Sequence, residues 1–238
     1  MAHLLGFGET LHGYDRWAAS YDHEPNPLIA ATSWVLHSAP LGCADCEVIE
    51  LGCGTGRNVV RVIGEGARSY LGVDGSAGML TIATHRFYDP RITFQQADLL
   101  VPWAPTRQYD LGLVCLVLEH LTNLEVFAET LARSIRAGGR IRIVDLHPER
   151  VAAGSLAHFN DGETEVQFAS IAHPVTSICD ALETAGFDVV RRDWIAGDPL
   201  ISAVPGLAKH RGLKVVLDIK ATRRGRMARG SSGYQTGA

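Results

Sequence analysis

The sequence contains no long hydrophobic run. None of its 238 residues belongs to an uninterrupted apolar stretch of about eighteen residues, the length that a membrane-spanning helix needs. The first residues, 1–6, also lack the positive charge and the apolar core of a secretory signal peptide. These absences predict a soluble, cytoplasmic protein with no membrane partner.

An excess of charge of one sign is missing too. The chain has 22 Lys and Arg against 26 Asp and Glu, a formal net charge of −4. A nucleic-acid-binding protein usually shows a basic stripe or patch, so we expect a small molecule and no nucleic acid as the partner. No heptad or repeated interface pattern appears, and a monomer and a homodimer both stay open.

Cysteine is scarce and odd in number. Five cysteines are scattered through apparent core elements, which favours reduced thiols over a disulfide framework. Cys43 and Cys46 have the spacing of a zinc or redox pair, but no second pair of Cys or His with metal spacing follows. We therefore expect an ordinary loop there and no metal site.

The sequence does contain a glycine-rich turn within residues 48–58. An apolar run leads into glycine at every second position, Gly52, Gly54 and Gly56, and then into residues that can open a helix. Glycine lets the backbone adopt positive φ and approach a ligand closely, so the turn suits a nucleotide-type ligand. Arg57 stands where the dinucleotide fingerprint requires its last glycine.

The residues Glu50-Leu51-Gly52-Cys53-Gly54-Thr55-Gly56 resemble the first motif of class I S-adenosylmethionine-dependent methyltransferases, and the small-molecule members are the most similar. Four further landmarks follow in the family's order: Asp74 after a second strand, Asp98 after a third, the apolar run 109–116, and the glycines of residues 135–140. The resemblance is strong over residues 45–146. It implies S-adenosylmethionine as cofactor and S-adenosylhomocysteine as product. The positions predicted to bind the cofactor are Tyr21, Gly52, Cys53, Gly54, Gly56, Asn58, Asp74, Gly75, Met79, Asp98, Leu99 and Leu116.

The resemblance and the apolar patterns together predict an α/β fold, a Rossmann-like doubly wound sheet of seven strands whose last strand is antiparallel. We expect helices at residues 58–65, 76–86, 124–138 and 176–185. The predicted organisation is an N-terminal helical cap at 1–40, a methyltransferase domain at 41–222 with an acceptor-pocket insertion at 147–174, and a flexible tail at 223–238.

Three of the predicted cofactor residues allow a second interpretation. A carboxylate at Asp74 can accept hydrogen bonds from both ribose hydroxyls, or it can cap the helix that starts near Ser76. Asp98 could be a solvated loop residue, and Met79 could fill the core as well as contact the adenine.

The cap carries aromatic residues at helical spacing. Tyr14, Trp17 and Tyr21 would share one face of a helix, and this face either packs on the core or contacts cofactor and substrate. We predict Tyr14 and Trp17 as substrate contacts. Four residues of the 147–174 insertion complete the predicted acceptor pocket: His147, His158, Phe159 and His173.

The stretch after the fourth strand, residues 115–121, decides the chemistry. It contains no proline, unlike the motif of methyltransferases that act on DNA adenine or protein glutamine, and its Leu-Glu-His-Leu resembles ubiquinone-biosynthesis methyltransferases. His120 is the first candidate for a general base because its ordinary pKa suits proton removal near neutral pH, although a structural role is equally open. Glu119 would orient it.

The predicted function is methyl transfer from S-adenosylmethionine to a small aromatic or enol-like acceptor, with carbon slightly favoured over oxygen or nitrogen. Two alternatives stay open. One is a nicotinamide-dependent oxidoreductase, against which Arg57 counts, and the other is a non-catalytic protein that binds S-adenosylmethionine.

Overall fold

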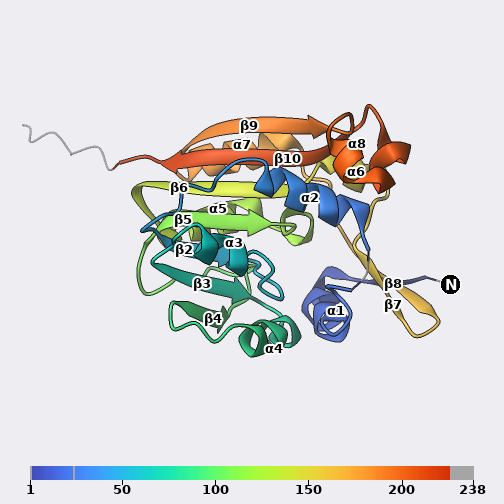
Figure 1. Cartoon of the computed structure of the whole chain (residues 1–238), viewed down its shortest axis with the longest axis horizontal. Helices are drawn as coiled ribbons and strands as arrows, with labels where there is room; N and C mark the ends of the chain where they lie inside the picture. The colour runs from blue at the N-terminus through green and yellow to red at the C-terminus, as the bar shows by residue number, and fades with distance from the viewer. Residues whose placement is uncertain (1, 24, 226–238) are drawn as a thin grey trace, which may run out of the picture.

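The computed structural model describes residues 2–23 and 25–225. Its centre is a seven-stranded sheet in the order β4-β3-β2-β5-β6-β10-β9 (Figure 1). Strands β4, β3, β2, β5 and β6 pair in parallel with one another, whereas β10 is antiparallel to both β6 and β9. The predicted fold class is thereby confirmed. The strands are β2 (Glu47–Leu51), β3 (Ser69–Asp74), β4 (Ile92–Gln96), β5 (Tyr109–Cys115), β6 (Ile135–Leu146), β9 (Phe187–Ile195) and β10 (Lys214–Arg223).

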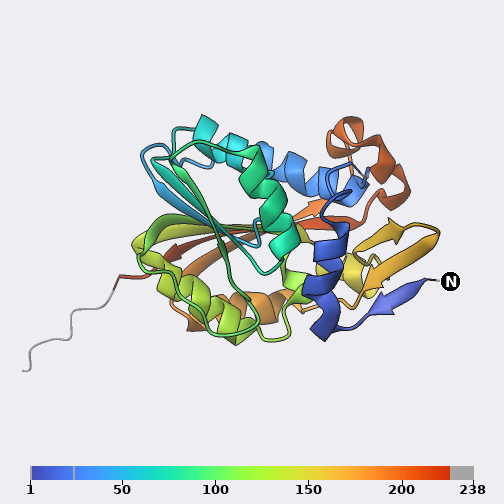
Figure 2. The same ribbon diagram turned by 90° about the horizontal axis from the view of Figure 1, so that it is seen from below.

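Helices cover both faces of this sheet (Figure 2). Helices α2 (Pro27–His37) and α3 (Val59–Gly64) bury apolar residues in one core cluster, and α5 (Leu124–Ser134) and α7 (Val175–Thr184) do so in another. On α5 the predicted stripe is buried because Leu124, Phe127 and Leu131 repeat at helical spacing. Helix α4 (Ala77–Arg86) packs beside β3 and β4.

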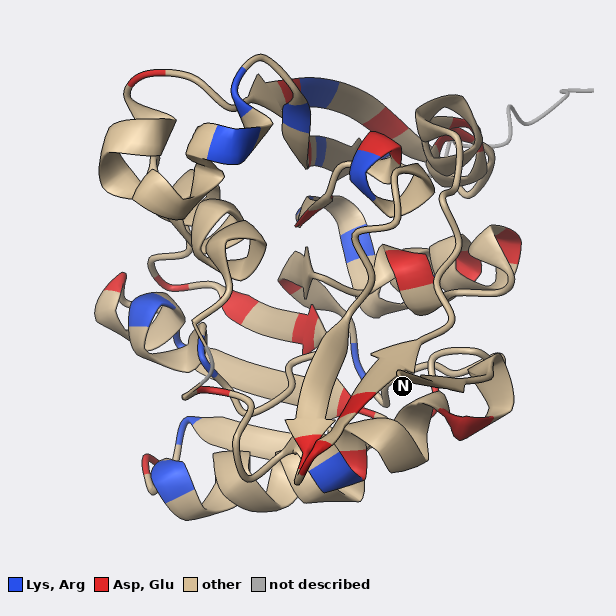
Figure 3. Cartoon of the chain, turned by 90° about the vertical axis from the view of Figure 1, so that its right-hand side faces the viewer, with Lys and Arg blue, Asp and Glu red and all other residues tan. Residues whose placement is uncertain are grey.

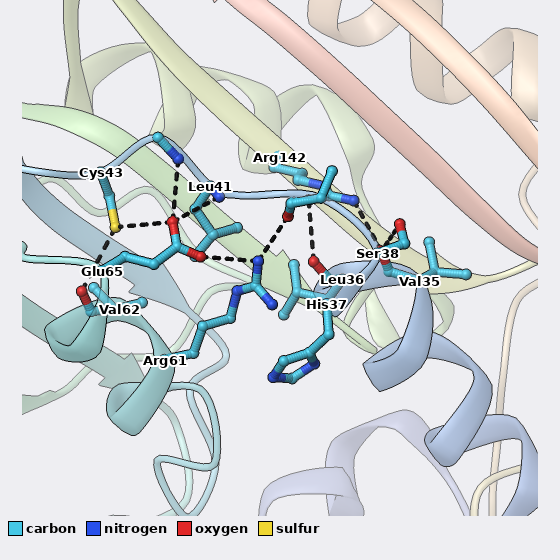
Figure 4. A network of polar contacts seen from close by, with 12 residues as sticks. Val35, Leu36, His37, Ser38, Leu41, Cys43, Arg61, Val62, Glu65 and Arg142 are labelled. Atoms are coloured by element: carbon cyan, nitrogen blue, oxygen red, sulfur yellow. Dashed lines mark hydrogen bonds and ion pairs between the residues drawn. The ribbon is translucent and has the colours of Figure 1, made fainter. Parts of the chain in front are cut away.

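The C-terminal end of α2 is tied to the sheet (Figure 4). Buried Arg142 of β6 donates to the carbonyls of Val35 and Leu36 in the last turn of α2. Its guanidinium also pairs with buried Asp218 of β10. The buried positive charge of Arg142 is tolerated because these two carbonyls and the Asp218 carboxylate all accept hydrogen bonds from its guanidinium.

The sequence did not predict a second, three-stranded sheet. Strand β1 (His3–Leu5) is parallel to β8 (Thr164–Phe168), which forms a hairpin with β7 (His158–Asp161). The segment that we expected to be an insertion thus contributes β7 and β8, and it also contains the short helix α6 (Pro148–Ala152). The hairpin turn is Gly162-Glu163, with Gly162 at φ 62° in its first position, where a two-residue hairpin turn of type II′ takes glycine.

This small sheet lies next to helix α1 (Thr10–Trp17), beyond the ends of β3 and β5 at which their arrows point (Figure 1). An aromatic cluster joins the two, because Trp17 of α1 stacks on Phe159 of β7 and Phe168 of β8 at ring separations of 5.4 and 5.8 Å. Figure 3, which looks onto this side, shows basic and acidic residues intermixed.

Two element boundaries differ from the prediction. Helix α5 ends at Ser134 and β6 begins at Ile135, so the expected helix over 124–138 is four residues too long. The apolar spacing of Leu131 and Ile135 continues the helical pattern, but Ile135 is buried by pairing with Tyr109 of β5. Arg223, expected in the tail, ends β10, while residues 226–238 of that predicted tail lie outside the described residues.

Two features are absent from the described ranges, 2–23 and 25–225. They contain no helix long and apolar enough to cross a membrane. They also contain no group of three or more His, Cys, Asp or Glu that could hold a metal ion. Cys43 and Cys46 are free thiols.

Candidate active site

The glycine turn follows β2 with three left-handed residues. Gly52, Gly54 and Gly56 have φ of 77°, 54° and 77°. A Cβ atom on Gly52 would lie 2.2 Å from Val117 Cγ2, whereas one on Gly54 would meet no atom within 4 Å. Glycine is thus required at 52 by both backbone and packing, and Gly54 leaves its backbone open on the cavity side.

A cavity opens between this turn, the ends of β3 and β5, and the cap, with about 860 Å³ of empty space that includes its open mouth. It gathers thirteen residues predicted for the site: Tyr14, Tyr21, Gly52, Cys53, Gly54, Asn58, Asp74, Gly75, Met79, Asp98, Leu99, Leu116 and His120. Gly56 lies outside it and approaches Phe87 instead.

Two carboxylates from neighbouring strands line this cavity. Asp74 accepts hydrogen bonds from the backbone N–H groups of Gly54 at 2.7 Å and Ser76 at 2.9 Å, while burial raises its pKa. The helix cap itself is Ser76, whose Oγ accepts from Met79 N. Asp98 accepts from Leu100 N through one oxygen. Carboxylates held in this way keep lone pairs that can accept from ligand hydroxyls.

Sequence reasoning missed two charged residues in this cavity, Glu50 and Arg57. Glu50 is buried, and its oxygens accept from Asn58 Nδ2 at 2.6 Å and from the Tyr70 hydroxyl at 2.5 Å. Burial raises its pKa. An acidic residue inside a buried apolar strand is itself the signal that could have identified Glu50.

His120 faces this first cavity from a 3-10 turn, Leu118–His120. Its Nε2 lies 2.8 Å from the Tyr14 hydroxyl, across 106 residues of sequence. Burial lowers the His120 pKa to about 4 and raises the Tyr14 pKa well above its ordinary value, so both groups are neutral near pH 7. The pair connects the cap helix α1 to the end of β5.

Glu119, the preceding residue, lines a second cavity. Its side chain is buried, and burial raises its pKa to about 7, against the opposing effect of a hydrogen bond with Ser170. The second cavity shares Tyr14, Tyr21 and Leu116 with the first, so the two adjoin.

The loop after β5 that carries these residues has an unusual backbone. Leu116 adopts φ 58°, a left-handed conformation that costs free energy in a residue with a side chain. Buried Asp145, on β6, compensates by accepting from the N–H groups of Val117 at 2.8 Å and Leu118 at 3.0 Å. This holds Leu116 between the two cavities and fixes the turn that presents Glu119 and His120.

Comparison with known proteins agrees with this geometry. Residues 48–139 match a family model described as a methyltransferase domain. This match assigns residues 48–139 to a methyltransferase domain. An uncharacterized methyltransferase of Emericella nidulans is 28% identical over 79% of both chains. A demethylmenaquinone methyltransferase of Tropheryma whipplei is 32% identical over 45% of each chain.

The fold of this methyltransferase is also similar to solved structures. An S-adenosylmethionine-dependent methyltransferase from Mesorhizobium loti superposes with a TM-score of 0.69 at 23% identity, over 82% of this chain and all of the other. The donor set of the first cavity fits the S-adenosylmethionine that the sequence motifs imply, because Asp74 and Asp98 offer acceptors for a ribose diol and Arg57 offers a cation for a carboxylate.

Four residues that we predicted for the acceptor pocket of the methyltransferase lie outside both cavities. His147 is buried as the N-cap of α6, where Nδ1 accepts from Glu149 N, and His173 Nε2 contacts the Leu121 carbonyl at 2.7 Å. His158 is exposed on β7, whereas Phe159, its neighbour, is buried in the aromatic cluster. Alternation along a strand explains why adjacent residues have such different surroundings.

Proposed function

We propose that this methyltransferase transfers a methyl group to a small, uncharged, largely apolar acceptor, aromatic or enol-like, bound in the second cavity. The observation that carries the proposal is the shared wall of Tyr14, Tyr21 and Leu116, which sets the second cavity directly beside the first. Apolar side chains dominate the remaining wall, and its described lining includes no Lys or Arg. The negative charge of an anionic acceptor would therefore have no cationic side chain to balance it in this cavity.

The cofactor would lie in the first cavity, against Gly52, Cys53 and Gly54, with Asp74 toward the ribose, Met79 and Asp98 toward the adenine. When bound, it supplies an electrophilic methyl group on a sulfonium. The chain's main contribution is to hold the acceptor close to that group and in line with it, which is worth up to roughly 7–11 kcal/mol of the barrier. Water exclusion by the cap helix supports this positioning.

Proton removal is needed only for an acceptor that must lose a proton, such as a phenol or an enol. His120 is one candidate because neutral imidazole nitrogen can accept a proton, and Glu119 is the other. We first expect methylation at a ring or enol carbon, since the charge of a phenolate or enolate is delocalised onto carbon. The name of the demethylmenaquinone methyltransferase supports a quinone-like ring as the class to test first.

The direct test is calorimetric titration of the protein with S-adenosylhomocysteine, repeated with Asp74→Ala. We expect micromolar binding by the intact protein and at least about a tenfold loss in the variant, because a charge-assisted hydrogen bond is removed. Phenols, enols and quinols are then screened as acceptors by mass spectrometry. Absence of binding by the intact protein would overturn the proposal.

A further inference from the structure

Glu119 carries a polar atom that the fold leaves unsatisfied. Its Oε2 is buried and has no hydrogen-bond partner within residues 2–23 and 25–225, although the residue lines the second cavity. Its side chain is only 7% exposed. A buried carboxyl oxygen without a partner is costly, and native proteins rarely keep one without a use.

Folding alone does not explain this placement. The only cationic candidate recorded beside the carboxyl in the described chain is His120, whose Nε2 is 3.9 Å from Oε1 and already contacts Tyr14. The backbone at Glu119 is nonetheless held firmly, because its carbonyl accepts from Ile171 N at 2.8 Å. The surrounding structure therefore fixes the position of Glu119 and leaves one oxygen without a partner.

A second unsatisfied atom belongs to the same cavity wall. Trp17 Nε1 is buried, and the described residues provide no acceptor for its N–H. The cavity thus combines one residue with a spare hydrogen-bond donor and one with a spare oxygen, in a wall that is mostly apolar apart from Asn26 and Ser155. Sites of this composition discriminate strongly for ligands that satisfy both groups.

We propose that Glu119 recognises the acceptor through an acidic hydroxyl group, that of a phenol or an enol, and takes its proton, while Trp17 donates to an oxygen of the same molecule. This inference rests on the proposed function and assigns the base role to Glu119, with His120 holding Tyr14 in place. In the step, the acceptor's O–H proton passes to the carboxylate. The acceptor gains the methyl group as the methyl–sulfur bond breaks, and the sulfur keeps that electron pair as neutral S-adenosylhomocysteine.

The charges around Glu119 suit this task. Burial raises its pKa to about 7, Asp145 at the end of β6 acts in the same direction, and Ser170 opposes them. Tyr14 and Tyr21 of the cap stay protonated because burial raises their pKa values, and His120 stays neutral. Among the residues that line the second cavity, Glu119 is therefore the group that changes charge near neutral pH, the range in which a general base is most effective. Asp145, whose pKa burial raises to about 6, does not line the cavity.

The test measures binding, not turnover, in the full chain saturated with S-adenosylhomocysteine. The probes are 2-naphthol and its methyl ether, 2-methoxynaphthalene, titrated calorimetrically at pH 8 and pH 6. We expect the intact protein at pH 8 to prefer the naphthol by about tenfold, because its hydroxyl donates to a buried carboxylate. This preference should fall severalfold at pH 6, where the carboxyl is protonated.

The variants separate recognition from folding. Glu119→Leu should bind the ether as the intact protein does and lose the preference for naphthol at both pH values. Exposed Glu129→Leu, the matched control on α5, should keep the preference. Trp17→Phe retains the stacked ring but lacks the N–H donor. It should weaken the binding of 2-naphthol and of 2-methoxynaphthalene about equally.

The outcomes distinguish this inference from the function on which it rests. If S-adenosylhomocysteine does not bind, the proposed function itself fails. If it binds but the naphthol preference is absent, is unchanged by Glu119→Leu, or neither probe binds at millimolar concentration, the assignment of Glu119 is overturned while the methyltransferase function stands.

Discussion

Replacing Glu119 with Gln should change the pH dependence of protein stability. Glutamine has nearly the same shape as glutamate and does not titrate in this range. Glu119 has an ordinary pKa of 4.5 and a pKa of about 7 in the folded protein, because it is buried. Since the folded protein holds this proton more tightly than the unfolded chain, the protonated side chain stabilises the fold, and this stabilisation is lost as the pH rises through about 7.

The magnitude follows from the two pKa values. Each pKa unit corresponds to about 1.36 kcal/mol, so ionisation of Glu119 costs the folded state about 3 kcal/mol at high pH. Nearly all of this cost is present at pH 8, and only a small part of it at pH 5. The free energy of unfolding of Glu119→Gln relative to the natural protein should therefore rise by roughly 2–3 kcal/mol between pH 5 and pH 8.

Urea unfolding of the cofactor-free protein measures this difference directly. Glu50, Asp74 and Asp145 also titrate with raised pKa values, but they are present in both proteins and largely cancel in the comparison. Glu129→Gln, at an exposed site, serves as control and should show no such dependence. A stability difference that stays constant within about 0.5 kcal/mol from pH 5 to pH 8 would refute the raised pKa and the argument built on it.

Three further predictions concern the frame of the site. Gly52→Ala should destabilise the protein by about 2–4 kcal/mol, because the new Cβ atom would overlap Val117 and residue 52 has a positive φ. Thermal unfolding measures this loss of stability, and an unchanged melting temperature would contradict the prediction. Asp145→Asn removes a charge that raises the Glu119 pKa, so the acid limb of Glu119-dependent naphthol binding should move to lower pH, and a shift upward would count against the electrostatic account. Asp15→Ala removes the acceptor for Ser76 Oγ and Gly78 N, so amide exchange in α1 should accelerate at least about tenfold, and equal rates would show that α1 is held by other contacts.

Local sequence signals predicted the sheet and which residues would gather around the first cavity. Apolar runs that end in glycine or aspartate specify parallel strands, and the carboxyl ends of such strands meet at one edge. Asp74 and Asp98 could therefore be placed together without a structure, as could Gly52 and Gly54. The three-stranded sheet was harder to predict because β1 and β8 pair across more than 150 residues, and no local pattern specifies a partner at that distance.

The roles of Glu119 and His120 illustrate the same limit. Their residue types suggested His120 as the base, because sequence supplies only ordinary pKa values. Burial then moves the two in opposite directions, to about 4 for His120 and about 7 for Glu119. Which ring nitrogen or carboxyl oxygen has a partner depends on contacts between distant segments, such as Tyr14 with His120.

The sequence alone determined the class of protein, the position of its cofactor turn and the absence of a strongly basic surface composition, because these depend on residue types at short spacing. The tertiary structure decided which aromatic and polar residues line the second cavity and which of their polar atoms have no hydrogen-bond partner among the described residues. It also decided which histidines lie outside both cavities. The physical reason is that burial and hydrogen-bond partners are properties of segments brought together by folding.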